Sequence, residues 1–506
     1  MAADNESLVD VTVKLEDSPS ILDEVGKPDG EELSTHLLNI EANRLSIAQS
    51  QQELQSLEEI TDQIQLLEHQ LDAAHRALFQ MNGKALFADE VGLGKTIEVG
   101  IVLKEMVFRE AHDTFLILTP AQLATQWQKE MREKFGLEFA CNYDDDFKGF
   151  DTSDKIVASI DTAKRDSYAE EIHKRSWDAL IIDEAHYLRN QDTNRYEFVD
   201  DIEYRYAFFA TATPVQNDVT DIYNVTKLIR PGLFGTKSEF ERRYLPNGDS
   251  EGVQSADDLN RQLQSVMIRH KRGDTKIDFT DRNVRTSSFE PSRREQSLYN
   301  AVTDYVRTHY SKQAGQHLVM LMLQKEVVSS PWAVLSTVEK WLDDDGRDVT
   351  GRERDKLLSI AKQARQIERT TKQEKLLEII RSVNRRMDTG RTIVFTQFRA
   401  TQDAIVNALQ TDAGGEDVPV HRVSGSLSSG EKDDQIQHFR ERGGVLVTTD
   451  SISEGRNIQF CNVIINYDLP WNPMSVEQRI GRIDRIGQDR DVYVYNLALE
   501  GTIEDY

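Results

Sequence analysis

The stretch ALFADEVGLGKTIE, residues 85–98, constrains the fold of this chain more than any other. Four apolar residues at its start predict a buried strand, and Gly92 and Gly94 predict a tight turn before a helix. Glycines let backbone N–H groups approach phosphate oxygens, and a helix N-terminus favours their negative charge. Lys95 can reach the outer phosphates of a nucleotide, and Thr96 can ligate magnesium. The stretch therefore predicts a phosphate-binding loop between a strand and a helix.

One residue departs from the usual pattern of such a loop. Asp89 stands where the eight-residue pattern begins with glycine, so the match holds at three of the four fixed positions. The alternative is a glycine-rich turn between a strand and a helix that binds no ligand. The rest of the chain must decide between the two interpretations.

Length and composition place the chain among multidomain globular proteins. A chain of 506 residues predicts two or more domains. No apolar run reaches the roughly 18 residues that cross a membrane, and residues 1–10 lack a signal-peptide pattern, which predicts a cytoplasmic protein. The two cysteines, Cys141 and Cys461, are far apart and predict neither a disulfide framework nor a zinc site.

The net charge of −26, from 61 basic and 87 acidic residues, argues against a general binder of polyanions. Either the partner is not a nucleic acid, or acidic residues coat the outside while a local basic groove binds. A halophilic prokaryotic cytoplasm would explain the second arrangement, because salt screens the repulsion between acidic residues. We keep both interpretations as hypotheses.

Strand-like apolar runs alternate with helical patterns in two blocks of the chain. Such alternation predicts an α/β fold with parallel sheets and right-handed crossovers. Residues 218–390, between the blocks, are mostly helical by pattern. The predicted strands are residues 85–88, 115–119, 155–160, 179–182 and 206–210 in the first block, and residues 392–395, 418–423, 444–448, 463–466 and 492–496 in the second.

Polar residues that could carry chemistry follow directly after these strands, where the active sites of parallel sheets gather. Asp183 and Glu184 follow the strand 179–182; the first could hold magnesium and the second could activate the attacking water. His186 contacts a motif that senses the γ-phosphate, or is simply packed in the core. Thr211 and Thr213 end another strand and could bond back to the acidic pair.

Three arginines near the end of the chain form a second candidate group. Arg479, Arg482 and Arg485 are three residues apart, so in a helix they would share one face. Burying that face without carboxylates would be unfavourable, which predicts a surface or a phosphate-facing site. An arginine that reaches the γ-phosphate accelerates hydrolysis, and the alternative is a basic face for nucleic acid.

The ordered set of motifs resembles those of helicase superfamily two, and more narrowly the Swi/Snf-type ATPases. The runs that carry the resemblance are DEVGLGKT (89–96), DEAH (183–186), TATP (211–214), SEGRN (453–457) and QRIGRIDRIGQ (478–488). In Swi/Snf-type ATPases Asp-Glu replaces the first glycine of the loop, which accounts for Asp89. His69, Gln70 and the run EQRIGR (477–482) are most similar to the RapA-like branch, whose members bind RNA polymerase.

The resemblance implies two RecA-like lobes with parallel sheets, helical insertions between them and a helical N-terminal extension. The regions that we predict are an acidic, disordered arm (1–36), a helical extension (37–65), an ATP-binding lobe 1 (66–280), a helical insertion and linker (281–390) and a lobe 2 (391–506). The chain stops at GTIEDY, where such proteins continue, and its start is too short for the amino-terminal modules of the RapA-like branch. We therefore expect a fragment of a longer protein.

The resemblance also implies roles for individual residues. Gln70 would bind adenine, Lys95 and Thr96 would bind the phosphates and Mg²⁺, and Asp183 would hold the metal. Glu184 would activate water, while Arg482 and Arg485 would complete the site from lobe 2. The other implied contacts to ATP are Asp89, Gly92, Gly94 and Gly455, and the implied contacts to nucleic acid are Thr119, Ser159, Thr396, Gln397, Ser424, Thr448 and Thr449.

The function implied is an ATP-driven motor on double-stranded DNA, which would translocate or displace bound protein without separating the strands. Backbone contacts of this kind read no sequence and need less positive charge than base reading. One alternative is a helicase that unwinds the duplex. Another is an ATP-gated switch that binds a protein partner such as RNA polymerase and depends little on DNA.

Overall fold

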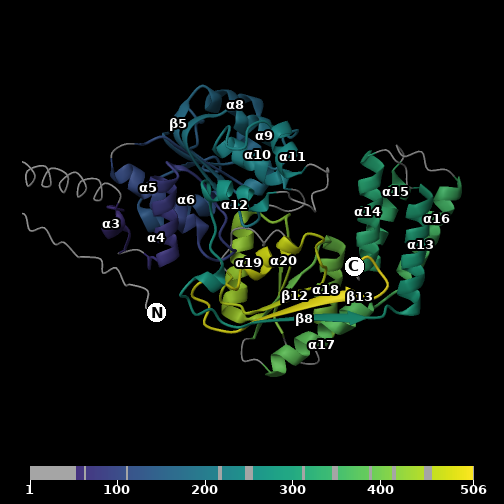
Figure 1. The fold of residues 1–506 in the computed structure, drawn as a ribbon. Helices are drawn as coiled ribbons and strands as arrows, with labels where there is room; N and C mark the ends of the chain where they lie inside the picture. Colours follow the sequence, from purple (N-terminus) through teal and green to yellow (C-terminus); the bar gives the residue numbers. More distant parts are fainter. Residues whose placement is uncertain are drawn as a thin grey trace, which may run out of the picture. The chain divides into compact units, whose positions relative to one another are not determined.

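The computed structural model describes residues 53–61, 64–109, 112–214, 219–245, 255–309, 314–344, 351–386, 390–412, 418–449 and 458–504. The predicted arm, residues 1–36, and residues 37–52 of the predicted extension lie outside these ranges. Two compact units divide the chain, residues 1–55 and 56–506. The second unit contains both sheets, each built mainly from one block of the chain (Figure 1).

The first sheet has seven parallel strands among the described residues, in the order β3-β4-β2-β5-β6-β1-β7. The strands are β1 (Lys84–Phe87), β2 (Phe115–Thr119), β3 (Ala140–Cys141), β4 (Lys155–Ser159), β5 (Ser176–Asp183), β6 (Glu203–Ala210) and β7 (Met267–Ile268). The helices of this lobe are α4 (Glu68–His75), α5 (Lys95–Phe108), α6 (Ala124–Phe135), α7 (Ile160–Ala163), α8 (Asp166–His173), α9 (Asn194–Asp200), α10 (Thr220–Ile229), α11 (Lys237–Tyr244) and α12 (Ala256–Gln264).

The second sheet has six parallel strands among the described residues, in the order β10-β11-β9-β12-β13-β8. The strands are β8 (Arg282–Phe289), β9 (Arg391–Phe395), β10 (Val420–Val423), β11 (Gly444–Thr448), β12 (Val463–Asn466) and β13 (Val492–Leu499). The helices against it are α17 (Thr371–Arg386), α18 (Arg399–Asp412), α19 (Ser429–Arg442) and α20 (Pro473–Ile480). Two parallel α/β lobes, as predicted from the alternation, are confirmed.

The second sheet shows why its strands read as continuous apolar runs. Successive side chains of a strand point to opposite faces, so Ile393 and Phe395 join one buried cluster while Val394 joins another. Helices α17 and α18 cover the face of Val394, and α19 covers the other. A parallel sheet buried on both faces cannot alternate between apolar and polar residues.

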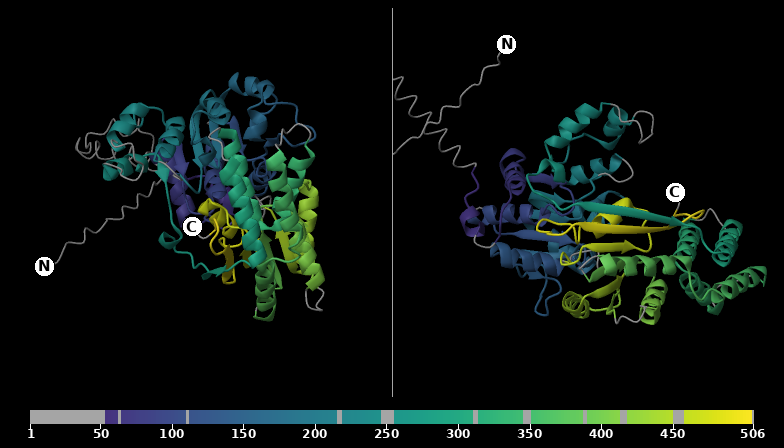
Figure 2. Two further views of the ribbon diagram at one scale, coloured as in Figure 1. Left: turned by 90° about the vertical axis from the view of Figure 1, so that its right-hand side faces the viewer. Right: turned by 90° about the horizontal axis from the view of Figure 1, so that it is seen from below.

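Strand β8 differs from the sequence prediction, which made residues 218–390 mostly helical. Residues 282–289 pair in parallel with β13 at the edge of the second sheet, and Figure 2 shows the two strands side by side. The sequence of β8, RNVRTSSF, is mostly polar and none of its residues is buried, as an edge strand can be. The strand was missed because its neighbour, and not its own hydrophobicity, holds it in the sheet.

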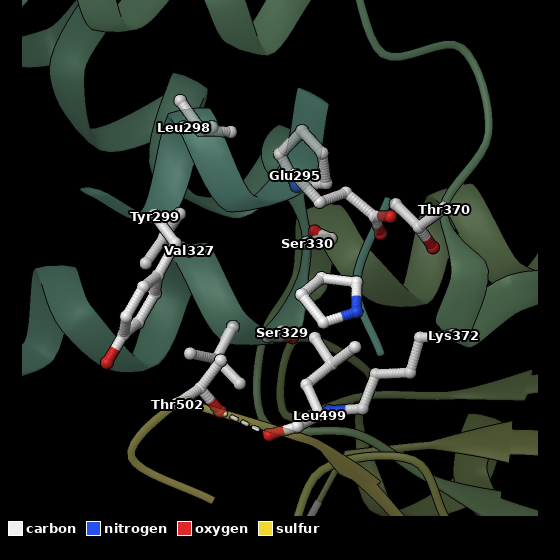
Figure 3. Close-up of a pocket in the computed structure, with 13 residues that line it drawn as sticks. Glu295, Leu298, Tyr299, Val327, Ser329, Ser330, Thr370, Lys372, Leu499 and Thr502 are labelled. Atoms are coloured by element: carbon white, nitrogen blue, oxygen red, sulfur yellow. Dashed lines mark hydrogen bonds between the residues drawn. The ribbon is translucent and has the colours of Figure 1, made fainter. Parts of the chain in front are cut away.

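Four helices between β8 and β9 form a cluster with its own apolar core. They are α13 (Arg293–His309), α14 (Ala314–Ser329), α15 (Pro331–Asp343) and α16 (Gly351–Arg365). Figure 3 shows where α13 and the end of α14 face Leu499 and Thr502 of the second lobe. The cavity at that seam, of about 20 Å³, has room for roughly one water molecule. The seam is therefore a packing contact and not a ligand site.

No helix in the described ranges combines the length and the apolar character that a bilayer crossing requires.

The boundaries of the five predicted regions remain predictions. Described residues of the predicted extension include the short helix α3 (Leu57–Thr61).

Candidate functional site

A cavity of about 410 Å³ lies at the carboxyl ends of the strands of the first sheet and is closed by residues of the second lobe. It collects most of the predicted residues of the nucleotide site from segments far apart in the sequence. Those that line it are Gln70, Gly92, Gly94, Lys95, Thr96, Asp183, Glu184, Arg482 and Arg485. Asp89 does not line it, and Gly455 lies outside the described residues.

The loop between β1 and α5 has the geometry that the sequence predicts. Gly92 and Gly94 have φ of 92° and 99°, a region that side chains other than glycine rarely adopt. A Cβ on Gly94 would lie 2.6 Å from Nε2 of Gln70. Nζ of Lys95 donates to the backbone oxygen of Asp89 at 2.8 Å, so the ammonium group is held at the mouth of the loop. The loop thus presents a cation and the start of a helix to the cavity.

Gln70 contacts this loop directly. Its Nε2 donates to the backbone oxygen of Leu93 at 3.0 Å, and its Oε1 accepts from the backbone N–H of Leu67 at 3.3 Å. The residue is 4% exposed and lines the cavity. Its amide is therefore anchored at the end of the cavity where α4 begins.

Asp89, the residue that departs from the phosphate-loop pattern, points away from the cavity. Its carboxylate accepts two hydrogen bonds from His270, from the backbone N–H at 2.8 Å and, through Oδ2, from Nδ1 at 2.9 Å. The backbone N–H groups of Ala88 and Glu90 donate to the oxygens of Ile268 and His270, which prolongs the ladder between β1 and β7. Asp89 therefore fastens the loop to the edge of the sheet.

The pair formed by His270 and Asp89 predicts a pH-dependent stability. The hydrogen bond to Asp89, with the charges of Asp89 and Asp72, raises the pKa of His270. Its contribution is fully present below the pKa of an unfolded histidine, about 6.5, and is lost as pH rises through the raised pKa. We expect the free energy of unfolding to fall over that range, and to fall less in His270→Gln. Urea unfolding at a series of pH values measures both.

Two features isolate the contribution of His270 in that experiment. Burial and the charge of Asp89 raise the pKa of Glu98, and this group is the same in both proteins. His75 lies on α4, where its ring contacts Phe79, so His75→Gln is the matched control and should keep the pH profile of the parent. An identical profile in His270→Gln would contradict the role given to this pair.

The acidic pair stands at the end of β5 and faces the cavity. Oδ2 of Asp183 accepts from the indole N–H of Trp127 at 2.7 Å, and Oδ1 accepts from the backbone N–H of Glu184 at 2.9 Å. Glu184 has φ of 54°, a left-handed conformation that costs a residue other than glycine of order 1 kcal/mol. Such strain is typical of functional positions, and here it turns two consecutive carboxylates toward one cavity.

The electrostatics of the pair indicate a place for a cation. Burial, followed by the charge of Glu184, raises the pKa of Asp183 to about 6. Burial acts in the same direction on Glu184, but the hydrogen bond and charge of His186, together with the charges of Lys95 and Arg482, outweigh it, so the pKa of Glu184 is lowered. A buried carboxylate with a raised pKa is stabilised in its charged form by a nearby cation. Asp183 and Thr96 offer the oxygen ligands that Mg²⁺ prefers, so the residues fit this metal.

Glu184 is held from both lobes. Nδ1 of His186 lies 3.0 Å from its Oε2 and 3.4 Å from the hydroxyl of Thr211. From α20, Nε2 of Gln478 donates to its Oε1 at 3.5 Å, a contact across 294 residues. Of the two interpretations of His186, the structure supports a contact with the Thr211 motif. Thr211 reaches the acidic pair only through this histidine.

The three arginines do not share a helix face, which corrects the sequence prediction. Helix α20 ends at Ile480, and only Arg479 lies on it. Arg479 is fully buried; it donates to Oδ1 of Asn466 at 2.9 Å and to the backbone oxygen of Asp468 at 3.0 Å. It also stacks over Phe395, 4.9 Å from the ring centre. Backbone and amide oxygens replace the carboxylates that the prediction required.

Arg482 and Arg485, by contrast, lie in the turns after α20 and line the cavity. The charge of Arg482 contributes to the lowered pKa of Glu184. Nε of Arg485 donates to the backbone oxygen of Gly481 at 2.8 Å, and burial lowers the pKa of this guanidinium. The break in the helix therefore separates one structural arginine from two that line the cavity.

Comparison with known protein families shows to which family the chain belongs. Residues 39–388 match the SNF2-related domain, and residues 371–487 match the helicase conserved C-terminal domain. The chain belongs to the SNF2-related family. The resemblance deduced from the motifs is confirmed, and the chain is an ATPase of the helicase-like class.

Two relatives of the SNF2-related chain are informative. This chain is 38% identical to the uncharacterized ATP-dependent helicase YqhH of Bacillus subtilis (strain 168), over 87% of this chain and 76% of YqhH. It is 28% identical to the RNA polymerase-associated protein RapA of Proteus mirabilis (strain HI4320), over 87% of this chain. The chain spans about half of the length of RapA, 48%.

The solved structures to which the chain is similar include the SWI2/SNF2 ATPase core of Sulfolobus solfataricus, in complex with dsDNA and alone. The sequence identity is 23% in both cases. The complex has a TM-score of 0.43 and covers 87% of this chain and 89% of that one. The core domain alone has a TM-score of 0.41 and covers 87% of each chain.

The predicted nucleic-acid contacts of the SNF2-related chain lie at neighbouring strand ends. Five of the seven residues are buried: Thr119, Ser159, Thr396, Ser424 and Thr448. Thr119 and Ser159 are register partners on β2 and β4, and the strands before the other five are adjacent in the second sheet. The hydroxyl of Thr396 donates to Asp468 at 2.6 Å, and that of Thr448 donates to the backbone oxygen of Thr449 at 2.8 Å. A hydroxyl contact with phosphate at Thr396 or Thr448 requires that these bonds be exchanged.

Sequence reasoning gave no role to two residues that contact the acidic pair. Trp127 lies on the buried face of α6, and nothing in the sequence indicates that the N–H of a buried tryptophan binds a carboxylate. Gln478 begins the QRIGRIDRIGQ run, and its place directly before the arginines was the signal that could have found it.

Proposed function

We propose that the cavity binds ATP with Mg²⁺ and that its hydrolysis drives motion of the two lobes along double-stranded DNA. The observation that carries the proposal is the cavity itself. It unites the phosphate loop and the acidic pair of one lobe with Arg482 and Arg485 of the other. A site divided between two lobes can couple the state of a nucleotide to their closure.

The nucleotide has an orientation in this cavity. Gln70 and the residues before α4 lie at one end and would receive the adenine, while Gly92, Gly94 and Lys95 would receive the phosphates. Thr96 and Asp183 would hold Mg²⁺, which when bound neutralises charge on the phosphate oxygens. Asp89 would act from outside the cavity, because it fixes the loop to His270.

Glu184 is the group that would orient and deprotonate the attacking water. Its lowered pKa keeps it ionised near neutral pH, as a base must be. His186 and Gln478 hold its two oxygens, so the carboxylate is oriented before the nucleotide arrives. Arg482 and Arg485 would then stabilise the charge that develops on the γ-phosphate.

The DNA contact rests on the family resemblance and on the strand ends. Backbone N–H groups and hydroxyls that follow β2, β4, β9, β10 and β11 would contact phosphates without reading sequence. Such contacts suit a translocase that follows the duplex and displaces bound protein. A specific observation favours the switch as a second candidate, since the relative RapA is named as RNA polymerase-associated.

We expect Lys95→Ala to lower DNA-stimulated ATP turnover at least about a hundredfold, because it removes the cation that faces the phosphates. Phosphate release, measured with and without linear duplex DNA, tests this. Lys129→Ala, an exposed lysine on α6, is the control and should keep the turnover of the parent. ATP hydrolysis that is indifferent to DNA in the parent would favour the switch.

Strand displacement separates the motor from the helicase. A translocase should displace the third strand of a triplex and leave a forked duplex paired. Efficient unwinding of the fork would instead support the helicase and contradict the translocase.

A further inference from the structure

Arg272 joins the two halves of the nucleotide site, although it does not line the cavity that contains them. It begins the short turn η3 (Arg272–Asp274), four residues after β7. Its backbone N–H donates to Oε2 of Glu90 at 2.9 Å, and its Nη2 donates to the backbone oxygen of Val91 at 3.2 Å. Both partners belong to the phosphate loop. The backbone and the guanidinium of Arg272 thus both bind the loop.

The guanidinium also binds the second lobe. Nη1 donates to Oδ2 of Asp484 at 2.6 Å, and Nη2 donates to the backbone oxygen of the same residue at 2.5 Å. Asp484 lies between Arg482 and Arg485 in sequence and is 1% exposed. Its Oδ2 accepts a further bond, at 2.9 Å, from Arg282 of β8. Arg272 therefore holds both the side chain and the backbone of the segment that carries the two cavity arginines.

The close approach of the phosphate loop to this segment requires glycine at position 92. A Cβ on Gly92 would lie 2.9 Å from the backbone oxygen of Asp484 and 3.0 Å from Nη2 of Arg272. Glycine at this position lets the loop, the guanidinium and the arginine segment meet. The loop is thus in contact with the other lobe as well as with the cavity.

We propose that Arg272 is a positioning residue that sets the distance between the phosphate loop and the arginine segment of the second lobe. The inference rests on the proposed function of the cavity. A guanidinium offers several donors in a fixed plane, so it can hold Asp484 and Val91 at once, which the single ammonium of a lysine cannot. Asp484 keeps Arg282 when Arg272 is removed, so the buried carboxylate retains a partner and the lobe can stay folded.

The inference predicts a separation of binding from turnover. Arg272 does not line the cavity, so ATP affinity should change less than about threefold in Arg272→Ala. Turnover at saturating ATP should fall between about tenfold and a hundredfold, because a misplacement of about 1 Å in a reacting group has an effect of that order. Arg272→Lys should restore only a small part of it.

The kinetic test compares Arg272→Ala, Asp484→Asn and the double variant. If both residues act through their contact, the double variant should lose no more turnover than the worse single variant. Arg195→Ala is the control, because Arg195 makes an equivalent two-bond contact to Asp161 within one lobe. Turnover of Arg272→Ala within twofold of the parent, or additive losses, would overturn the inference.

A second measurement needs no ATP hydrolysis and so separates this inference from the proposed function. Spin labels at Glu170→Cys on α8 and Gln437→Cys on α19 report the distance between the lobes of the nucleotide-free protein. Both positions are exposed. Arg272→Ala should broaden the distance distribution, and Arg195→Ala should leave it unchanged. An unchanged distribution in Arg272→Ala overturns the positioning role even if the parent hydrolyses no ATP.

Discussion

Glu184→Gln is expected to bind ATP with the affinity of the parent and to hydrolyse it between about a hundredfold and ten-thousandfold more slowly, the range that a general base contributes. The amide keeps the length of the side chain and can still contact Gln478, but it cannot accept a proton from water. Because His186 and Gln478 hold the group in place, the loss should fall on turnover and not on folding. Binding of a fluorescent ATP analogue and phosphate release at saturating ATP measure the two quantities.

The control for this prediction makes the same chemical change outside the cavity. Glu133 is exposed on α6, where it pairs with Lys129, and Glu133→Gln should behave as the parent does. Turnover of Glu184→Gln within about tenfold of the parent would remove Glu184 as the base. Loss of ATP binding in the same variant would mean that the carboxylate shapes the cavity and does not act on water.

The sequence predicted the strands of both sheets where their apolar runs are continuous. Residues 115–119, 444–448 and 463–466 form strands with the predicted bounds, because a strand buried on both faces must be apolar throughout. The phosphate loop was predictable for a different reason. Its glycines and Lys95 act locally, so their spacing alone describes the turn.

The contacts that could not be predicted from the sequence are made between residues far apart along the chain. His270, which explains Asp89, is 181 residues away, and Asp484, which explains Arg272, is 212 residues away. The three arginines show the same limit although they lie within one run of eleven residues, 478–488. A spacing of three predicted one shared face, but α20 ends at Ile480, so Arg479 is buried against the ring of Phe395 while Arg482 reaches the cavity.

Arg482→Ala should keep ATP binding and lose about a thousandfold in turnover, which is the lower end of the effect of an arginine supplied to the γ-phosphate. The residue is 7% exposed, lines the cavity, and lowers the pKa of Glu184 through its charge. Arg482 is a smaller cause of this lowered pKa than His186 and Lys95, so Glu184 stays ionised in the variant and the loss should fall on the chemical step. Binding of a fluorescent ATP analogue and phosphate release at saturating ATP measure the two quantities.

The outcome distinguishes a catalytic arginine from a basic surface that only attracts DNA. Arg490 is half exposed and close in sequence, and Arg490→Ala removes the same charge without reaching the cavity. If both variants lose only affinity for DNA, and more so at low salt, the arginines act through long-range attraction. If only Arg482→Ala loses turnover at saturating DNA, the charge acts on the nucleotide from the second lobe. Because the phosphate loop and Arg482 belong to different lobes, that result would make lobe closure a condition of hydrolysis.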